Sequence, residues 1–181
     1  MPRSLGSVPL MAAATEIPAV PDEARRLAVR VPMTAERSEV LNLLTIEAGT
    51  WLGEPVDTGA EAVGPGGHRR RFATDLRLRV SDRSERALFR KAAIVELGTP
   101  VEAPDGTVSV EIGWRAATLA PLFPVFSGRL VVGSHDASLR GLYAPPGGRI
   151  GRLADAALFH LAAEGTARWL LRELAAAAAR G

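Results

Sequence analysis

The sequence predicts an α+β fold in which an antiparallel sheet packs against a long C-terminal helix. Apolar and polar residues alternate in several segments between residues 72 and 118, which is typical of strands with one buried and one solvated face. Short turns join these segments, so consecutive strands are expected to pair as an antiparallel meander. The chain then ends in an alanine-rich run whose apolar residues recur at helical spacing.

The composition indicates one globular domain behind an N-terminal tail. Residues 1–22 are rich in Pro, Ser and Ala without periodicity, so they are expected to form a flexible tail, with a single domain over residues 23–181. Hydrophobic residues make up 47% of the chain and charged residues 23%, which is enough apolar material for one core. The first strand is predicted where Leu27, Val29 and Val31 alternate with polar neighbours.

Helical spacing follows this first strand. Thr34 is expected to cap a helix whose buried side includes Val40 and Leu44. Gly49 and Gly53 predict that the helix breaks into two short pieces. A loop rich in Pro and Gly is expected after them, up to the start of the alternating strands.

The next segments carry the clearest strand pattern. Phe72, Thr74 and Leu76 are expected on a dry face, with Arg71 and Arg77 on the opposite, wet face. The segment from Pro104 to Thr107 contains Asp-Gly, a strong signal for a tight hairpin turn. A further strand follows it, and two more complete about five strands.

The end of the chain predicts a long helix. Two prolines and two glycines after Tyr143 end the last strand, and a helix of roughly 30 residues is expected to begin near Ile150. Its apolar face comprises Phe159, Ala163, Thr166, Leu170 and Leu174. A polar stripe at i, i+4 spacing comprises His160, Glu164, Arg168 and Arg172.

This order of elements resembles the helix-grip fold of the START-like (SRPBCC) superfamily, which includes polyketide cyclases, lipid-transfer domains and plant ligand-binding proteins. The resemblance rests on "FPVFSGRLVV", on "LRGLYAPPGGRIGRLADAALFHLAAEGTARWLLRELA" and on the alternation between residues 72 and 118. It implies a curved antiparallel sheet wrapped around the long C-terminal helix, with two short helices after the first strand. It also implies a hydrophobic cavity between sheet and helix, where members of the superfamily bind lipids, polyketides or sterols.

On this resemblance, large side chains on the inner surfaces are the candidates for contact with a ligand. The candidate ligand-binding residues are Trp114, Phe123, Phe126, Tyr143, Phe159 and His160. The alternative that the aromatic residues simply fill a core stays open. It also stays open which of Phe123 and Phe126 points inward, because nearby prolines can shift the register.

Three functions are consistent with these residues. The leading hypothesis is binding of an apolar small molecule, a lipid or a polyketide-like compound, in the cavity. The second is a cyclase or aromatase in which His160, Tyr143 or Arg115 positions oxygen atoms, with Glu164 orienting the imidazole as a general acid or base. His160 and Glu164 can equally be an ordinary surface pair. The third is a non-catalytic interaction protein that forms a homo-oligomer such as a homodimer.

Other classes of partner are not expected. The net charge is only +2, and the arginines from Arg69 to Arg71 alternate between the two faces of a strand, which favours a mixed charged ladder over a nucleic-acid surface. No cofactor or metal is expected, since the chain has no Cys and its 3 His are far apart. No membrane-spanning segment is expected, and a cytoplasmic location is favoured.

Overall fold

The computed structural model describes residues 24–56, 62–64, 67–78, 89–117, 124–144 and 156–181. Its strands are β1 (Arg25–Pro32), β2 (Glu54–Pro55), β3 (Ala62–Gly64), β4 (Gly67–Leu78), β5 (Phe89–Leu97), β6 (Val101–Glu102), β7 (Val108–Ala116), β8 (Val125–Val132) and β9 (Asp136–Ala144). Its helices are α1 (Arg37–Thr45), α2 (Gly49–Leu52) and α3 (Ala156–Ala178). This is the predicted α+β fold, with α1 and α2 following the first strand.

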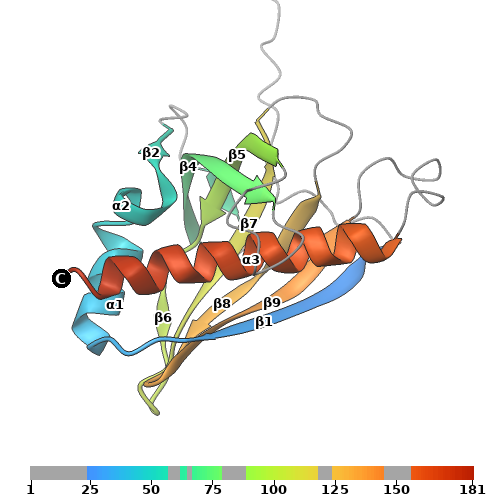
Figure 1. The fold of residues 1–181 in the computed structure, drawn as a ribbon. Helices are drawn as coiled ribbons and strands as arrows, with labels where there is room; N and C mark the ends of the chain where they lie inside the picture. Colours follow the sequence, from blue (N-terminus) through green and yellow to red (C-terminus); the bar gives the residue numbers. More distant parts are fainter. Residues whose placement is uncertain (1–23, 57–61, 65–66, 79–88, 118–123, 145–155) are drawn as a thin grey trace, which may run out of the picture.

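All strand pairs in the described residues are antiparallel. The sheet has the order β1-β9-β8-β7-β5-β4-β2, with β3 paired to β4 and β6 paired to β7. The strands curve around α3, which crosses the sheet on its inner side (Figure 1). The helix-grip arrangement predicted from the sequence is therefore confirmed.

The two faces of α3 have different side chains, as its periodicity predicts. The buried residues Ala163, Thr166, Ala167, Leu170 and Leu174 have 1% exposure or less. Thr166 is satisfied within the core, since its Oγ1 donates to the Ala162 carbonyl at 2.9 Å. Small side chains on this face let the helix lie close against the strands.

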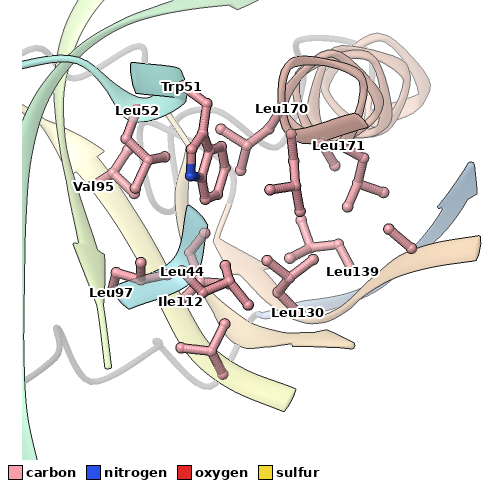
Figure 2. Close-up of a cluster of buried hydrophobic side chains, with 14 of the residues drawn as sticks. Leu44, Trp51, Leu52, Val95, Leu97, Ile112, Leu130, Leu139, Leu170 and Leu171 are labelled. Atoms are coloured by element: carbon pink, nitrogen blue, oxygen red, sulfur yellow. The ribbon is translucent and has the colours of Figure 1, made fainter. Parts of the chain in front are cut away.

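The interior is filled by α1 and α2 around the C-terminal half of α3. Trp51 and Leu44 meet Leu170 from α3 and leucines of the sheet in one cluster (Figure 2). The indole N–H of Trp51 donates to the Leu43 carbonyl at 3.1 Å, so its polar group is satisfied. The guanidinium of Arg70 in β4 donates to the Leu44 and Thr45 carbonyls and holds the C-terminus of α1.

The structure corrects the predicted start of the first helix. The helix begins at Arg37 with Glu36 as N-cap residue, and no side chain forms a cap hydrogen bond. Thr34 does not cap it, because strand-like pairing continues to Met33, whose N–H donates to the His135 carbonyl at 3.1 Å.

The predicted loop after the short helices is also different. It contains β2 and β3, both of which add to the edge of β4. The prediction that Arg71 lies on a solvated face of β4 is wrong, because its side chain is only 10% exposed. The expected start of α3 near Ile150 lies outside the described residues.

The Asp105-Gly106 turn is confirmed. Gly106 has a φ of 83°, which favours glycine, and the Thr107 N–H donates to Asp105 Oδ1 at 2.9 Å. This hydrogen bond lowers the pKa of the Asp105 carboxyl below its ordinary value. The turn joins β6 to β7 and sets the register at which β7 enters the sheet.

A pair of glycines leaves room for one aromatic ring. Gly128 in β8 and Gly141 in β9 are directly paired, and the Phe126 ring lies over both. A Cβ at Gly128 would be 2.6 Å from Phe126 Cζ and 2.3 Å from the Arg140 carbonyl oxygen. The sequence therefore needs glycine here for the ring to occupy its position.

We predict that Gly128→Ala lowers the free energy of unfolding by about 1–3 kcal/mol, because the added methyl group clashes with backbone as well as with the ring. Urea denaturation measures the change. The matched control is Gly49→Ala, since a Cβ there meets nothing within 4 Å. This control should be neutral or stabilising by up to about 1 kcal/mol, because alanine favours helix. Equal stabilities of the two variants would contradict the packing described.

Candidate functional site

A row of large side chains crosses the inner face of the sheet. Trp114 in β7 pairs with Phe126 in β8, which pairs with Tyr143 in β9. Directly paired residues share one face of a sheet, so all three point toward α3. The backbone register brings together residues that are up to 29 positions apart in the sequence, from Trp114 to Tyr143.

The first two members of this row stack. The ring centroids of Trp114 and Phe126 are 4.1 Å apart and the interplanar angle is 19°. Both side chains are buried, with exposures of 2% and 0%. The stack is a rigid apolar surface beside the glycine pair.

The indole N–H of Trp114 is different from that of Trp51. Its Nε1 is buried and has no hydrogen-bond partner, as far as the structure describes the chain. A buried donor without an acceptor costs about 1–3 kcal/mol. An unsatisfied group of this kind in a native interior is a candidate contact for a ligand atom.

Tyr143 begins a hydrogen-bonded chain that ends on α3. Its hydroxyl lies 3.1 Å from Nδ1 of His160, and Nε2 of His160 lies 3.3 Å from Oε1 of Glu164. The carboxylate favours the tautomer with a proton on Nε2, and Nδ1 then accepts the hydroxyl proton. The helical spacing of His160 and Glu164 places both on the side of α3 that reaches the end of β9.

The chain connects the interior with solvent. Tyr143 is 0% exposed, whereas the side chains of His160 and Glu164 are 42% and 32% exposed. The imidazole therefore offers a route for a proton between solvent and the buried hydroxyl. This carboxylate, imidazole and hydroxyl sequence is an arrangement used in general acid–base chemistry.

The pKa of Tyr143 is raised above its ordinary value. Burial is the main cause, and the negative charge of Glu164 adds to it. Arg25 opposes the rise through its positive charge and a hydrogen bond. Arg25 lies directly across from Tyr143 in the register of β1 and β9. The hydroxyl therefore stays protonated and able to donate.

Four of the six candidate ligand-binding residues come together as described: Trp114, Phe126, Tyr143 and His160. The question of register is settled for Phe126, which points inward. Phe123 lies outside the described residues. Phe159 belongs to α3, but its side chain lies outside what the structure describes. These residues therefore remain predictions as ligand contacts.

The positions of Arg115 and Arg25 differ from what the sequence predicted. Arg115 follows Trp114 in β7, so its side chain points to the outer face and does not join Tyr143 and His160. Arg25 was missed, because the periodicity of the first strand shows which residues alternate but not which residue of β9 each one faces.

No metal centre emerges from the part of the chain that the structure describes, where no three His, Cys, Asp or Glu side chains gather in a group that could hold an ion. Among the same residues, no helix has the length and hydropathy needed to cross a membrane.

The sequence matches no protein-family profile and no curated protein. Solved structures with a similar fold include the Zhui aromatase/cyclase from a Streptomyces species, with a TM-score of 0.50 at 15% identity over 87% of this chain and 94% of that one. A conserved protein from Geobacillus kaustophilus has a TM-score of 0.49 at 10% identity over 86% and 96%. A protein from Mycobacterium smegmatis has a TM-score of 0.43 at 16% identity over 83% and 88%.

The architecture and the first of these likenesses define the class of fold. The chain has the helix-grip fold that the sequence predicted. An identity of 15% shows the fold alone, so the chemistry has to be argued from the residues of this chain.

We predict that the phenolate of Tyr143 forms at a pH above the ordinary midpoint of about 10. Tyr143 is the single tyrosine of the chain, so the phenolate absorbance reports this group directly. Because Glu164 raises the pKa, Glu164→Gln should lower the midpoint, and unfolding in urea should return it to about 10. A midpoint that is the same in the folded and unfolded states would contradict the burial of the hydroxyl.

The same shift sets a pH dependence of stability. A group with a raised folded pKa stabilises the fold fully below its unfolded pKa of about 10. The free energy of unfolding should therefore decline as the pH rises above this value. In Tyr143→Phe, urea denaturation over this alkaline range should show a smaller decline than in the unmodified protein.

Proposed function

We propose that the protein binds an apolar small molecule that carries an oxygen atom, of the lipid or polyketide-like kind, between the sheet and α3. The observation that carries the proposal is the buried indole N–H of Trp114, which lacks an acceptor among the described residues. An oxygen of the ligand would accept this hydrogen bond, while the Trp114 and Phe126 stack would contact its apolar body.

The distribution of polar groups along the interior supports this position. At the end that α1 and α2 fill, Trp51 is satisfied by the backbone and the neighbouring side chains are aliphatic. Beside this cluster, Trp114 pairs with Val95, and its donor lies on an aromatic surface that continues through Phe126 to the Tyr143 hydroxyl. A few polar groups on an apolar wall are typical of sites that fix the orientation of a small molecule.

Binding requires a change in the conformation around these residues. Phe126 and Tyr143 have 0% exposure and Trp114 has 2%, so none offers free surface in the conformation described. His160 and Glu164 are the partly exposed members of the site. Movement of side chains next to them would open the route to the buried row.

The fold adds support of a general kind. START-like domains form ligand-binding interiors between sheet and helix, and one solved structure with this fold is that of an aromatase/cyclase. This likeness supports the class of ligand only through the shared architecture.

We predict that the protein binds acetylnaphthalene about tenfold more tightly than ethylnaphthalene, because only the ketone accepts a hydrogen bond from Trp114. Trp114→Phe should remove this preference. The matched control is Trp51→Phe, which removes a satisfied indole from α2 and should keep the preference. Calorimetric titration measures the affinities, and native mass spectrometry gives the stoichiometry. Equal binding of the two compounds to the unmodified protein would contradict the proposal.

A second candidate function is favoured by the Tyr143, His160 and Glu164 chain. We propose as the alternative that the site catalyses proton transfer during cyclisation of a polyketide-like chain. In this step a protonated His160 would donate from Nδ1 to the Tyr143 oxygen, which frees the hydroxyl to donate its own proton to a ligand oxygen. The Nδ1 proton would then replace the one that Tyr143 gives up, which leaves the neutral imidazole with its proton on Nε2 beside Glu164, and solvent would supply the next proton.

For this alternative we predict that His160→Ala and Tyr143→Phe each lower turnover of a linear polyketone thioester by about 10²-fold or more. Leu161→Ala is the control, since Leu161 neighbours His160 on α3 and is 44% exposed. Chromatography of the cyclised product measures the rate. Unchanged turnover in both site variants would rule out the catalytic role. The binding proposal is tested separately, by the titration with acetylnaphthalene and ethylnaphthalene.

A further inference from the structure

The outer face of the sheet, opposite to the proposed site, carries buried charges. Arg69 and Arg71 in β4 have side chains that are 9% and 10% exposed, and the side chain of Glu96 in β5 is 6% exposed. Buried charged groups are costly unless they are paired and hydrogen-bonded. Each of these three charged groups is therefore expected to have partners for its polar atoms.

The pairs on this face leave several donors unused. Arg69 Nη2 donates to Glu111 Oε2 at 3.0 Å, but Arg69 Nε is buried and has no hydrogen-bond partner in the described residues. Arg71 Nε lies 3.1 Å from Glu96 Oε1, yet these two atoms are not aligned for a hydrogen bond. The two ion pairs therefore satisfy the guanidinium groups only in part.

Arg115 adds a third guanidinium to the same face. Its Nε is buried, and the structure gives it no hydrogen bond or ion pair with any residue that it describes. Arg115 and Glu111 flank Gly113 on β7, and Gly113 is paired with Glu96. Because Gly113 has no side chain, only backbone atoms of β7 line the space between these charged groups.

The balance of charge points to a missing anion. Four guanidinium groups, from Arg69, Arg71, Arg115 and Arg129, lie on this face with two carboxylates, from Glu96 and Glu111. The positive charges outnumber the negative ones, and the Nε donors of Arg69, Arg71 and Arg115 have no acceptor among the described residues, while Glu96 Oε1 is a buried acceptor without a donor. Guanidinium groups match the geometry of carboxylate and phosphate oxygens.

We propose that the outer face of β4, β5 and β7 binds a small oxyanion over Gly113, with Arg115 as its main ligand. The carboxylate of Glu111 competes with the oxyanion for this site. Its side chain is 43% exposed and forms an ion pair with Arg69. When an oxyanion binds, it replaces the Glu111 carboxylate as the partner of Arg69 and also accepts hydrogen bonds from Arg115. The shared chemistry is that of a phosphate or a carboxylate group, and the site is independent of the interior ligand.

The test is a calorimetric titration of the full chain with inorganic phosphate and, separately, with acetate, at constant ionic strength. We expect saturable binding of at least one anion, and the tighter one identifies the source of the oxyanion. Arg115→Met should weaken this binding by about tenfold or more, because a charge-assisted hydrogen bond is lost. Glu111→Gln should strengthen it, because the competing carboxylate is removed.

The matched control is Arg26→Met, which removes the same charge from an exposed position on the outer face of β1, at the other edge of the sheet. It should change the affinity by less than about threefold. Circular dichroism checks that each variant folds, and Arg115→Lys, which keeps the charge but loses the planar fork of donors, gives a second test of geometry. Absence of saturable binding for both anions, or equal losses in Arg115→Met and Arg26→Met, would overturn the proposal.

Discussion

The close packing of α3 against the curved sheet is the interaction on which the rest of the structure depends. Ala163, Ala167 and Thr166 present short side chains to the strands, so the helix approaches closely and the larger side chains of the sheet define the interior. At one end, Trp51 closes this space with a satisfied indole. At the other end, the same helix brings His160 to the hydroxyl of Tyr143. The position of one helix thus determines both the packed core and the polar chain.

The alternation of residues was sufficient to predict the fold and the inner face of most strands. A period of two shows which side chains share a face, and the faces of β7 and α3 agree with that reading. It does not show what covers the opposite face, so the burial of Arg71 and Glu96 could not be foreseen. The N-cap at Thr34 was wrong for a related reason: pairing between β1 and β9 extends to Met33, and such long-range pairing overrides a local capping signal.

The candidate site could be predicted only as a set of residue types. The sequence pointed to Trp114, Phe126, Tyr143 and His160, but their proximity depends on the register of three strands and on the rotation of α3. Nothing local distinguishes the indole of Trp114 from that of Trp51. Their difference arises from one backbone carbonyl, that of Leu43, which accepts from the Trp51 indole and has no counterpart at Trp114 among the residues that the structure describes.

One strand serves both faces of the sheet. In β7, Trp114 points toward α3 while Glu111 and Arg115 point outward, so a slip of one residue would exchange a buried indole for a guanidinium. The turn at Asp105 and Gly106 prevents such a slip, because it starts β7 from a fixed position against β6. The glycines at positions 128 and 141 then let Phe126 lie beside Trp114 without displacing the neighbouring strands. The chemistry proposed for the two faces therefore depends on the same register, although the two sites share no side chain.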